Sequence, residues 1–289
     1  MPEPAAPAAQ HVRVARWRYV VPNAITCTSL LLGLAAIVLS FQADHAGAAW
    51  LIVLCVLLDK ADGTAARALK ATSRIGLQLD SFSDFVTFGI APACILFAVM
   101  LHDPAGAGDV WASGAARWGL YALLAGYVLC ACIRLAKFNV LAEILPADGP
   151  KVFYGLPSTF SGGLLVVIFL IGDKHGWVWL VRWMPLIAAA FAALMVSNLP
   201  LPKLGKRKAM WLNVFTAINV AFGYVCGIFR ILPEYIFCAV TLYAVVGFGW
   251  GFIHRRELSP RHLDPYAVAP PRQKKKRWRK GFRALRPRR

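Results

Sequence analysis

Charged side chains are scarce in this chain, and acidic ones are the scarcest. Of its 289 residues, 16% are charged and 58% are hydrophobic. The 14 Asp and Glu are outnumbered by 32 Lys and Arg, which gives a formal net charge of +18. So little charge among so many apolar side chains excludes an intrinsically disordered chain and an ordinary soluble nucleic-acid binder. The composition is typical of a polytopic membrane protein.

The sequence also lacks a cysteine framework. Its seven cysteines all lie in apolar segments, and no pair has C-x-x-C spacing. This excludes a disulfide-stapled secreted domain and favours reduced thiols packed as small apolar residues. The opening residues MPEPAAPAAQ have neither a basic start nor an apolar core, so a cleaved signal peptide is not expected.

Long apolar runs, by contrast, recur along the chain. A helix needs about 20 apolar residues to cross the hydrocarbon core. We therefore predict an all-α membrane bundle of about eight transmembrane helices, with a cytoplasmic juxtamembrane segment at 1–21, a transmembrane domain at 22–253 and a basic cytoplasmic tail at 254–289. The spans are predicted at roughly 22–41, 47–68, 78–101, 116–138, 157–172, 177–198, 211–231 and 234–253.

The basic residues predict how this bundle is oriented. With eight spans, 28 of the 32 Lys and Arg lie on the side of the two termini, and 14 of these lie in the tail. Positive residues gather on the cytoplasmic side, so both termini are predicted to be cytoplasmic. Within the tail, Trp278, Phe282 and Leu285 give residues 273–289 an apolar helical face. That pattern favours a helix on anionic lipid, with a disordered tail as the alternative and nucleic-acid binding as the less favoured one.

Four of the few acidic residues lie close together, at Asp59, Asp62, Asp80 and Asp84. The first two are three residues apart and the last two are four apart, so each pair shares one face of a helix. The two helices are predicted to be antiparallel neighbours, which brings the pairs together. Four carboxylates cannot share an apolar gap uncompensated, and oxygen ligands without His or Cys suit Mg²⁺ or Mn²⁺, one ion or two.

Metal ions at a membrane boundary suggest phosphoryl transfer on a diphosphate whose lipid tail stays in the bilayer. Gly63 and Ala66 leave space beside the first pair of aspartates, and Arg67 can contact a phosphate. Two alternatives remain. In the first, the aspartates form a charged helix end paired with nearby Lys and Arg. In the second, they serve a cation-coupled transporter, although transporter sites usually lie near the bilayer midplane.

The same residues carry a resemblance to the CDP-alcohol phosphotransferase family. Its motif, D-x-x-D-G-x-x-A-R followed by G-x-x-x-D-x-x-x-D, is matched at every fixed position, and Gly76 opens the second half. Three further segments resemble the bacterial-type phosphatidylserine synthases of this family: Pro22-Asn23-Ala24-Ile25-Thr26, Arg134-Leu135-Ala136-Lys137-Phe138-Asn139-Val140 and Tyr154-Gly155-Leu156-Pro157-Ser158. In the second of these, Lys137 stands where Arg is usual.

The resemblance implies an enzyme that transfers a phosphatidyl group from CDP-diacylglycerol to L-serine and releases CMP. Choline, inositol or glycerol 3-phosphate are the alternative acceptors. It also implies a catalytic domain at 22–253, a homodimer, and a place in a bacterial-type inner membrane with the site on the cytoplasmic side.

The resemblance also implies roles for individual residues. The four aspartates are the implied ligands of two metal ions, and Asp84 is also the implied general base. CDP-diacylglycerol is expected to contact Gly63, Ala66, Arg67, Gly76, Asn23 and Thr26; acceptor binding is expected at Arg134, Lys137 and Asn139. The two basic acceptor residues can equally reflect positive-inside topology, and Asn23 or Thr26 can equally cap the first helix.

Overall fold

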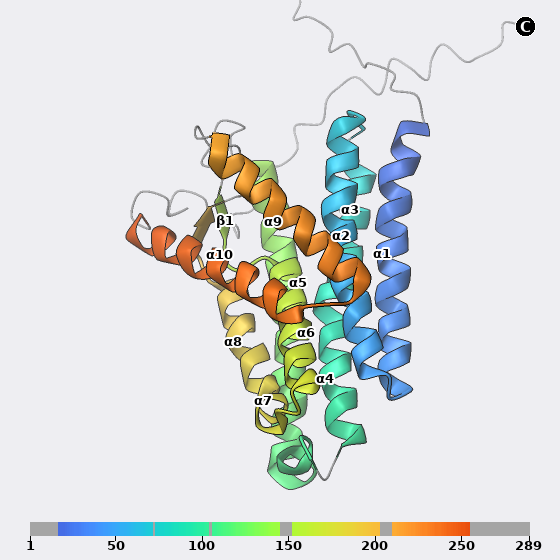
Figure 1. The fold of residues 1–289 in the computed structure, drawn as a ribbon, viewed down its shortest axis with the longest axis vertical. Helices are drawn as coiled ribbons and strands as arrows, with labels where there is room; N and C mark the ends of the chain where they lie inside the picture. Colours follow the sequence, from blue (N-terminus) through green and yellow to red (C-terminus); the bar gives the residue numbers. More distant parts are fainter. Residues whose placement is uncertain (1–16, 72, 104–105, 145–151, 203–209, 255–289) are drawn as a thin grey trace, which may run out of the picture. The chain divides into compact units, whose positions relative to one another are not determined.

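The computed structural model describes residues 17–71, 73–103, 106–144, 152–202 and 210–254. These residues are predominantly helical (Figure 1). The long helices are α1 (Trp17–Phe41), α2 (His45–Ala68), α5 (Gly114–Ile144), α6 (Ser158–Lys174), α8 (Met184–Val196), α9 (Met210–Phe229) and α10 (Pro233–Ile253). The shorter segments are α3 (Arg74–Asp84), the π-helix η1 (Phe85–Ile90), α4 (Ala91–His102), the 3₁₀ turn η2 (Asp109–Trp111) and α7 (Val178–Arg182).

The described helices follow the predicted apolar runs, but the count of eight spans is not confirmed. Within the described residues, four helices are long and apolar enough to cross a membrane: Arg18–Phe41, Arg74–His102, Gly114–Ala142 and Pro233–Ile253. In the second of these, α3, η1 and α4 follow one another without a break. The sixth predicted span is divided at Trp183 into α7 and α8. The prediction for the tail, 254–289, lies outside the described residues apart from His254.

The all-α prediction missed a small β-ribbon. Strands β1 (Val152–Tyr154) and β2 (Pro200–Pro202) pair antiparallel, with Phe153 opposite Leu201. Strands of three residues are too short to show an alternating pattern, and two of the residues in β2 are prolines. The ribbon packs against α10, where Gly251 lies so close that a Cβ there would come within 1.7 Å of the Pro200 carbonyl oxygen.

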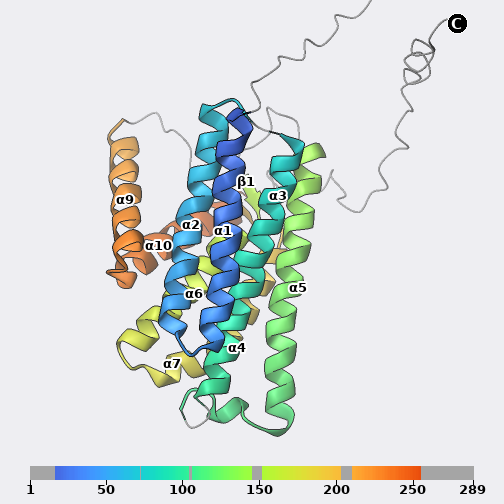
Figure 2. The same ribbon diagram turned by 90° about the vertical axis from the view of Figure 1, so that its right-hand side faces the viewer.

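Helix α6 lies at the centre of the fold. Its side chains are buried from Ser158 to Gly172, apart from the partly buried Phe160. It packs against α2, α8, α10 and η1, while α1, α2 and the α3–α4 run lie side by side along one flank of the bundle (Figure 2). An apolar helix that is buried on all sides is stabilised by packing rather than by an amphipathic face.

The π-helix η1 follows directly after Asp84 and is held by buried partners. Tyr127 of α5 donates its hydroxyl hydrogen to the Phe88 carbonyl at 2.9 Å, and Ser161 of α6 donates to the Tyr127 oxygen at 3.3 Å. Gly162 lets α6 approach the same turn, since a Cβ there would lie 2.7 Å from the Phe88 oxygen. π-Turns inside helices are rare and often occur beside functional sites.

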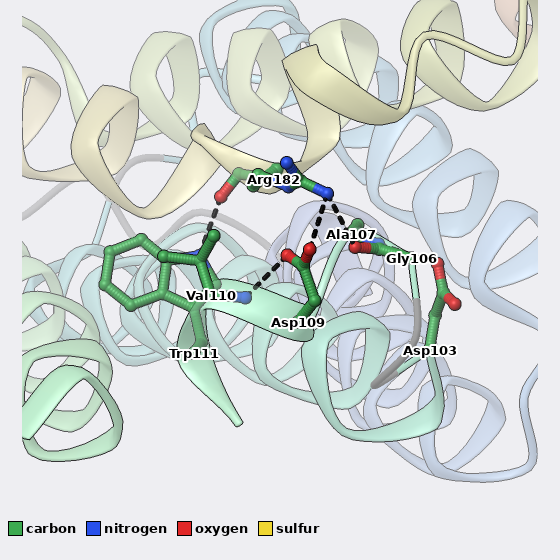
Figure 3. A network of polar contacts seen from close by, with 7 residues as sticks. All are labelled: Asp103, Gly106, Ala107, Asp109, Val110, Trp111 and Arg182. Atoms are coloured by element: carbon green, nitrogen blue, oxygen red, sulfur yellow. Dashed lines mark hydrogen bonds and ion pairs between the residues drawn. The ribbon is translucent and has the colours of Figure 1, made fainter. Parts of the chain in front are cut away.

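At the end of the bundle that contains η2 and α7, a polar network joins the α4–α5 connection to α7 (Figure 3). Arg182 forms a salt bridge with Asp109 at 2.8 Å and donates to the Gly106 carbonyl at 3.2 Å. Trp111 donates its indole N–H to the Arg182 carbonyl at 2.8 Å, and Asp103 accepts from the Ala107 backbone at 2.9 Å. These contacts hold the α4–α5 connection against α7, so Arg182 has a structural role in this part of the fold.

Candidate metal and phosphate site

The predicted site residues gather at one end of the bundle. Asp59 and Asp62 lie in the last three turns of α2, and Asp80 lies in α3, the helix that follows it. Helix α1 packs against both α2 and α3, and its Thr26 lies in its third turn. Figures 1 and 2 show α1, α2 and α3 side by side at this end. The two aspartate helices α2 and α3, which were predicted to pair antiparallel, therefore surround the site together with α1.

Three of the four aspartates form a compact oxygen cluster. Carboxylate oxygens of Asp59, Asp62 and Asp80 all lie within 4.8 Å of one another. Asp62 is 6% exposed and accepts a hydrogen bond from the Thr26 hydroxyl at 2.7 Å. The sequence predicts that Thr26 either contacts the nucleotide or caps the first helix. In the structure Thr26 lies inside α1, and its hydroxyl donates a hydrogen bond to Asp62 of α2.

Asp84 lies one turn beyond Asp80, at the junction of α3 and η1. It is not one of the three aspartates in the compact cluster. It interacts electrostatically with Asp59, Asp80 and Arg134, so it remains a close neighbour of the cluster. A carboxylate beside the cluster, on a helix held by buried partners, is well placed to exchange a proton with a bound group.

Arg134 of α5 supplies positive charge to the aspartates. Its side chain is buried, with 7% exposed, and it interacts electrostatically with Asp84, Asp59 and Asp80, in that order of strength. It donates to the Ser158 hydroxyl at 3.1 Å and lies 5.1 Å from the centre of the Phe138 ring. One guanidinium cannot balance four carboxylates, so the arrangement still favours cation binding.

The start of α6 adds two site residues that the sequence analysis did not assign. Thr159 lies close to the Asp59 carboxylate, and Ser158 is the partner of Arg134. Both side chains are buried. The sequence signal for these two residues is a pair of hydroxyl side chains directly after Pro157, at the start of an apolar helix. Which charged groups they contact depends on how α6 packs against α2 and α5.

The other two predicted acceptor residues have different surroundings. Lys137 donates to the amide oxygen of Asn198 and to the Val196 and Ser197 carbonyls at the end of α8. Asn139 donates to Ser81 of α3 at 3.0 Å, one residue after Asp80. Lys137 thus joins α5 to the end of α8, since a cation commonly bonds the terminal carbonyls of a helix. Asn139 joins α5 to α3, the helix that carries Asp80.

The small residues of the motif permit close approaches. A Cβ at Gly76 would lie 3.0 Å from the Asn23 side-chain oxygen, so Gly76 lets α1 approach the start of α3. Asn23 lies six residues after the start of α1, which rules out the alternative that it caps this helix. The exposed Arg67 donates to Thr64 at 3.2 Å and lies beside Gly63, and Ala66 is partly buried next to it.

The donor set fits a hard divalent cation. The clustered ligand atoms are all carboxylate oxygens, and no His or Cys belongs to the cluster in the described part of the chain. Oxygen-only ligands match Mg²⁺ or Mn²⁺, whereas zinc sites usually include nitrogen or sulfur. Asp59, Asp62 and Asp80 are therefore the residues that would hold a metal ion here.

Comparisons with known proteins agree with this chemistry. A family model for CDP-alcohol phosphatidyltransferase matches residues 19–195. The chain is 32% identical over 191 residues to a CDP-diacylglycerol–serine O-phosphatidyltransferase of Mycobacterium bovis; the match covers 64% of this chain and 62% of the relative. It is 29% identical to the enzyme of that name from Helicobacter pylori over 72% of this chain and 81% of the relative. For the Bacillus subtilis enzyme the identity is 34%, over 51% of this chain and 74% of the relative.

Proposed function

Because the chain belongs to the CDP-alcohol phosphatidyltransferase family, we propose that it transfers the phosphatidyl group of CDP-diacylglycerol to L-serine, forming phosphatidylserine and releasing CMP. The observation that carries the proposal is the cluster of Asp59, Asp62 and Asp80, whose oxygens lie within 4.8 Å of one another. The three relatives compared above are all named as serine transferases, which supports serine over choline, inositol or glycerol 3-phosphate.

The aspartates are proposed to hold Mg²⁺ or Mn²⁺, as two ions. When bound, such ions neutralise the diphosphate and make CMP a better leaving group. Thr26 orients the carboxylate of Asp62 by hydrogen bonding, and the nearby Thr159 hydroxyl is proposed to do the same for Asp59. Second-sphere bonds of this kind fix ligand geometry and raise metal affinity.

Asp84 is proposed as the general base, and as a further metal ligand or neighbour. It takes the proton from the serine hydroxyl, whose oxygen attacks the phosphorus that carries the diacylglycerol. The bond from that phosphorus to the CMP oxygen breaks, and CMP leaves with the electron pair. This direct displacement needs no covalent enzyme intermediate.

Substrate contacts follow from the residues around the cluster. Gly63, Ala66 and Arg67 line the exposed side of the α2 end and are proposed, with Gly76, Asn23 and Thr26, to bind CDP-diacylglycerol. Arg134 is the strongest proposed partner for the serine carboxylate, since it is the buried cation among the aspartates. Lys137 and Asn139 contribute by fixing α5 against α8 and α3.

The arrangement in the membrane is also a proposal. Eight helical passes with both termini and the site in the cytoplasm account for the distribution of basic residues. The bacterial-type inner membrane, a homodimer, and binding of the basic tail to anionic lipid complete this proposal. The last of these concerns residues outside the described part of the chain.

CMP release by the purified protein tests the function. The protein is incubated with CDP-diacylglycerol, Mg²⁺ or Mn²⁺, and serine, choline, inositol or glycerol 3-phosphate in turn. Release with serine alone is expected, and it should stop when EDTA removes the metal. Release only with another alcohol contradicts the acceptor assignment. No release with any alcohol, together with cation-dependent uptake into vesicles, would instead indicate a transporter.

A further inference from the structure

A cavity of about 450 Å³ lies at the opposite end of the bundle from the aspartates. Its walls come from the first turns of α2, the last turns of α6 and the connection between α9 and α10. The aspartates lie near the other end of α2, and their partners Ser158 and Thr159 lie at the other end of α6. The cavity is therefore separate from the proposed catalytic site. It is lined by Ala46, Trp50, Leu170, Asp173, Lys174, Arg230, Ile231, Leu232 and Pro233.

The charged side chains of this cavity differ in their bonding. Lys174 forms a salt bridge with Glu234 at 2.7 Å, and His175 contacts the same carboxylate at 2.9 Å. Within the described residues, the side chains of Arg230 and Asp173 form neither a hydrogen bond nor a salt bridge, and both are exposed. The cavity thus offers one guanidinium and one carboxylate, and most of the remaining wall is apolar.

The backbone at Arg230 is unusual for a residue with a side chain. Arg230 and Leu232 have positive φ angles of 57° and 49°. The Ile231 N–H donates to the Cys226 carbonyl at 2.9 Å and so closes the end of α9. Helix ends with this bond usually have glycine at the left-handed position. An arginine at such a position costs conformational energy, which is consistent with a use for its side chain.

Exposed tryptophans indicate the depth of the cavity in the membrane. Trp177, Trp179 and Trp183 follow the end of α6 and are each more than 40% exposed. Tryptophan gathers where the hydrocarbon meets the head groups. Lys174, at the rim of the cavity, precedes the first of them by three residues. The rim therefore lies at the depth of the phospholipid head groups, in the leaflet away from the aspartates.

We propose that this cavity binds the head group of a phospholipid that carries both a phosphate and a primary ammonium. Arg230 donates hydrogen bonds to the phosphate, and Asp173 accepts from the ammonium. Trp50, Leu170 and Leu232 contact the glycerol and the first methylene groups. A head group with phosphate but no cation leaves Asp173 uncompensated, and a quaternary ammonium has no hydrogen to donate to it.

Lipid binding by the full chain in detergent tests this proposal. Phosphatidylethanolamine, phosphatidylcholine and phosphatidylglycerol are titrated separately, and bound lipid is counted by native mass spectrometry. The unsubstituted protein is expected to bind phosphatidylethanolamine most tightly. Arg230→Asn, whose new side chain tolerates the left-handed backbone, is expected to bind it about ten-fold more weakly, as for loss of one charge-assisted hydrogen bond.

Two further variants make the result specific. Arg117→Asn removes an exposed cation near the start of α5 that does not line the cavity, and it should bind like the unsubstituted protein. Asp173→Asn should lose the preference for phosphatidylethanolamine over phosphatidylglycerol. The proposal is overturned if Arg230→Asn binds as tightly as the unsubstituted protein, if both arginine variants lose binding equally, or if the three lipids bind alike. A thermal midpoint of Arg230→Asn without lipid that is unchanged or higher shows that the fold is kept.

Discussion

Single residues in this site act through hydroxyl groups as much as through carboxylates. Asp62 is buried and would be costly to desolvate without a donor, and Thr26 supplies one at 2.7 Å. The same hydroxyl also lies 3.1 Å from the Pro22 carbonyl of its own helix, so its single hydrogen is shared between the two acceptors. Thr26 therefore positions a carboxylate of the oxygen cluster from a neighbouring helix.

Replacing this hydroxyl should weaken metal binding. Thr26→Val keeps the shape of the side chain and removes the donor to Asp62, so the Mg²⁺ concentration for half-maximal CMP release should rise roughly ten-fold. Turnover at saturating metal should largely persist. Thr28→Val is the matched control, because Thr28 is exposed and bonds only the Ala24 carbonyl, at 2.8 Å. An unchanged metal requirement would contradict this positioning role, even if the KM for CDP-diacylglycerol rises.

The proposed base allows an equally direct measurement. Asp84→Asn retains the volume of the side chain and cannot take the serine proton, so CMP release should fall by at least about a hundred-fold. Binding of CDP-diacylglycerol, measured by equilibrium titration with metal present, should stay within a few-fold of the unsubstituted protein. Activity close to that of the unsubstituted protein would show that another group accepts the proton. Asp103→Asn, in the network at the far end, serves as the control for a carboxylate outside the site.

At the scale of helices and strands, small residues decide how the last helix packs. Gly247 and Gly251 of α10 face β2, against Leu201 and Pro200. Gly249 lies between them and has open space around it. Gly247 and Gly251 therefore form a packing seam within the chain, and Gly249 does not belong to it.

This difference predicts opposite effects of the same substitution. Gly251→Ala places a Cβ within 1.7 Å of the Pro200 oxygen, which is backbone and cannot turn away, so α10 must shift from the ribbon at a cost of about 1–3 kcal/mol. Gly249→Ala meets no atom and should be neutral, or more stable by about 0.5–1 kcal/mol through helix propensity. Thermal midpoints of the two variants in detergent check this. Equal midpoints would mean that α10 does not pack on β2 in the protein in solution.

At the scale of the whole molecule, the two ends of the bundle have different chemistry. The aspartates, Arg134 and the exposed Arg67 lie at one end. The other end carries the exposed Trp177, Trp179 and Trp183 and the Arg182 network shown in Figure 3. An acidic site that needs water-soluble serine and releases CMP must open to the compartment that holds both, which is why the aspartate end is proposed to be cytoplasmic.

Labelling from outside the cell tests the orientation. In a variant without native cysteines, Ser113→Cys lies in an exposed position at the tryptophan end, and Arg74→Cys lies in an exposed position at the aspartate end. A maleimide that cannot cross membranes should label the first in intact cells and the second only after the cells are permeabilised. The reverse pattern would invert the proposed topology. Labelling of both in intact cells would exclude opposite sides.

Much of this architecture could be predicted from local sequence. The apolar runs predicted the helices. The spacing of Asp59 with Asp62 and of Asp80 with Asp84 predicted that each pair shares one face of a helix and that the pairs meet. In the structure Asp59, Asp62 and Asp80 form the compact cluster, and Asp84 lies outside it. The β-ribbon, the break at Trp183 and the π-turn after Asp84 were not predicted. Each depends on long-range packing, as when Tyr127 of α5 satisfies the Phe88 carbonyl of η1.

The sequence by itself determined that this is a helical membrane protein with a carboxylate motif of the CDP-alcohol phosphatidyltransferase type. Those properties depend on composition and on spacing within single helices, which the chain carries locally. Only the tertiary structure decided that Thr26 bonds Asp62, that Thr159 lies close to Asp59, and that Arg134 is buried among the aspartates rather than lying at the membrane surface. These contacts join residues from five different helices, and their geometry is set by how the helices pack around α6.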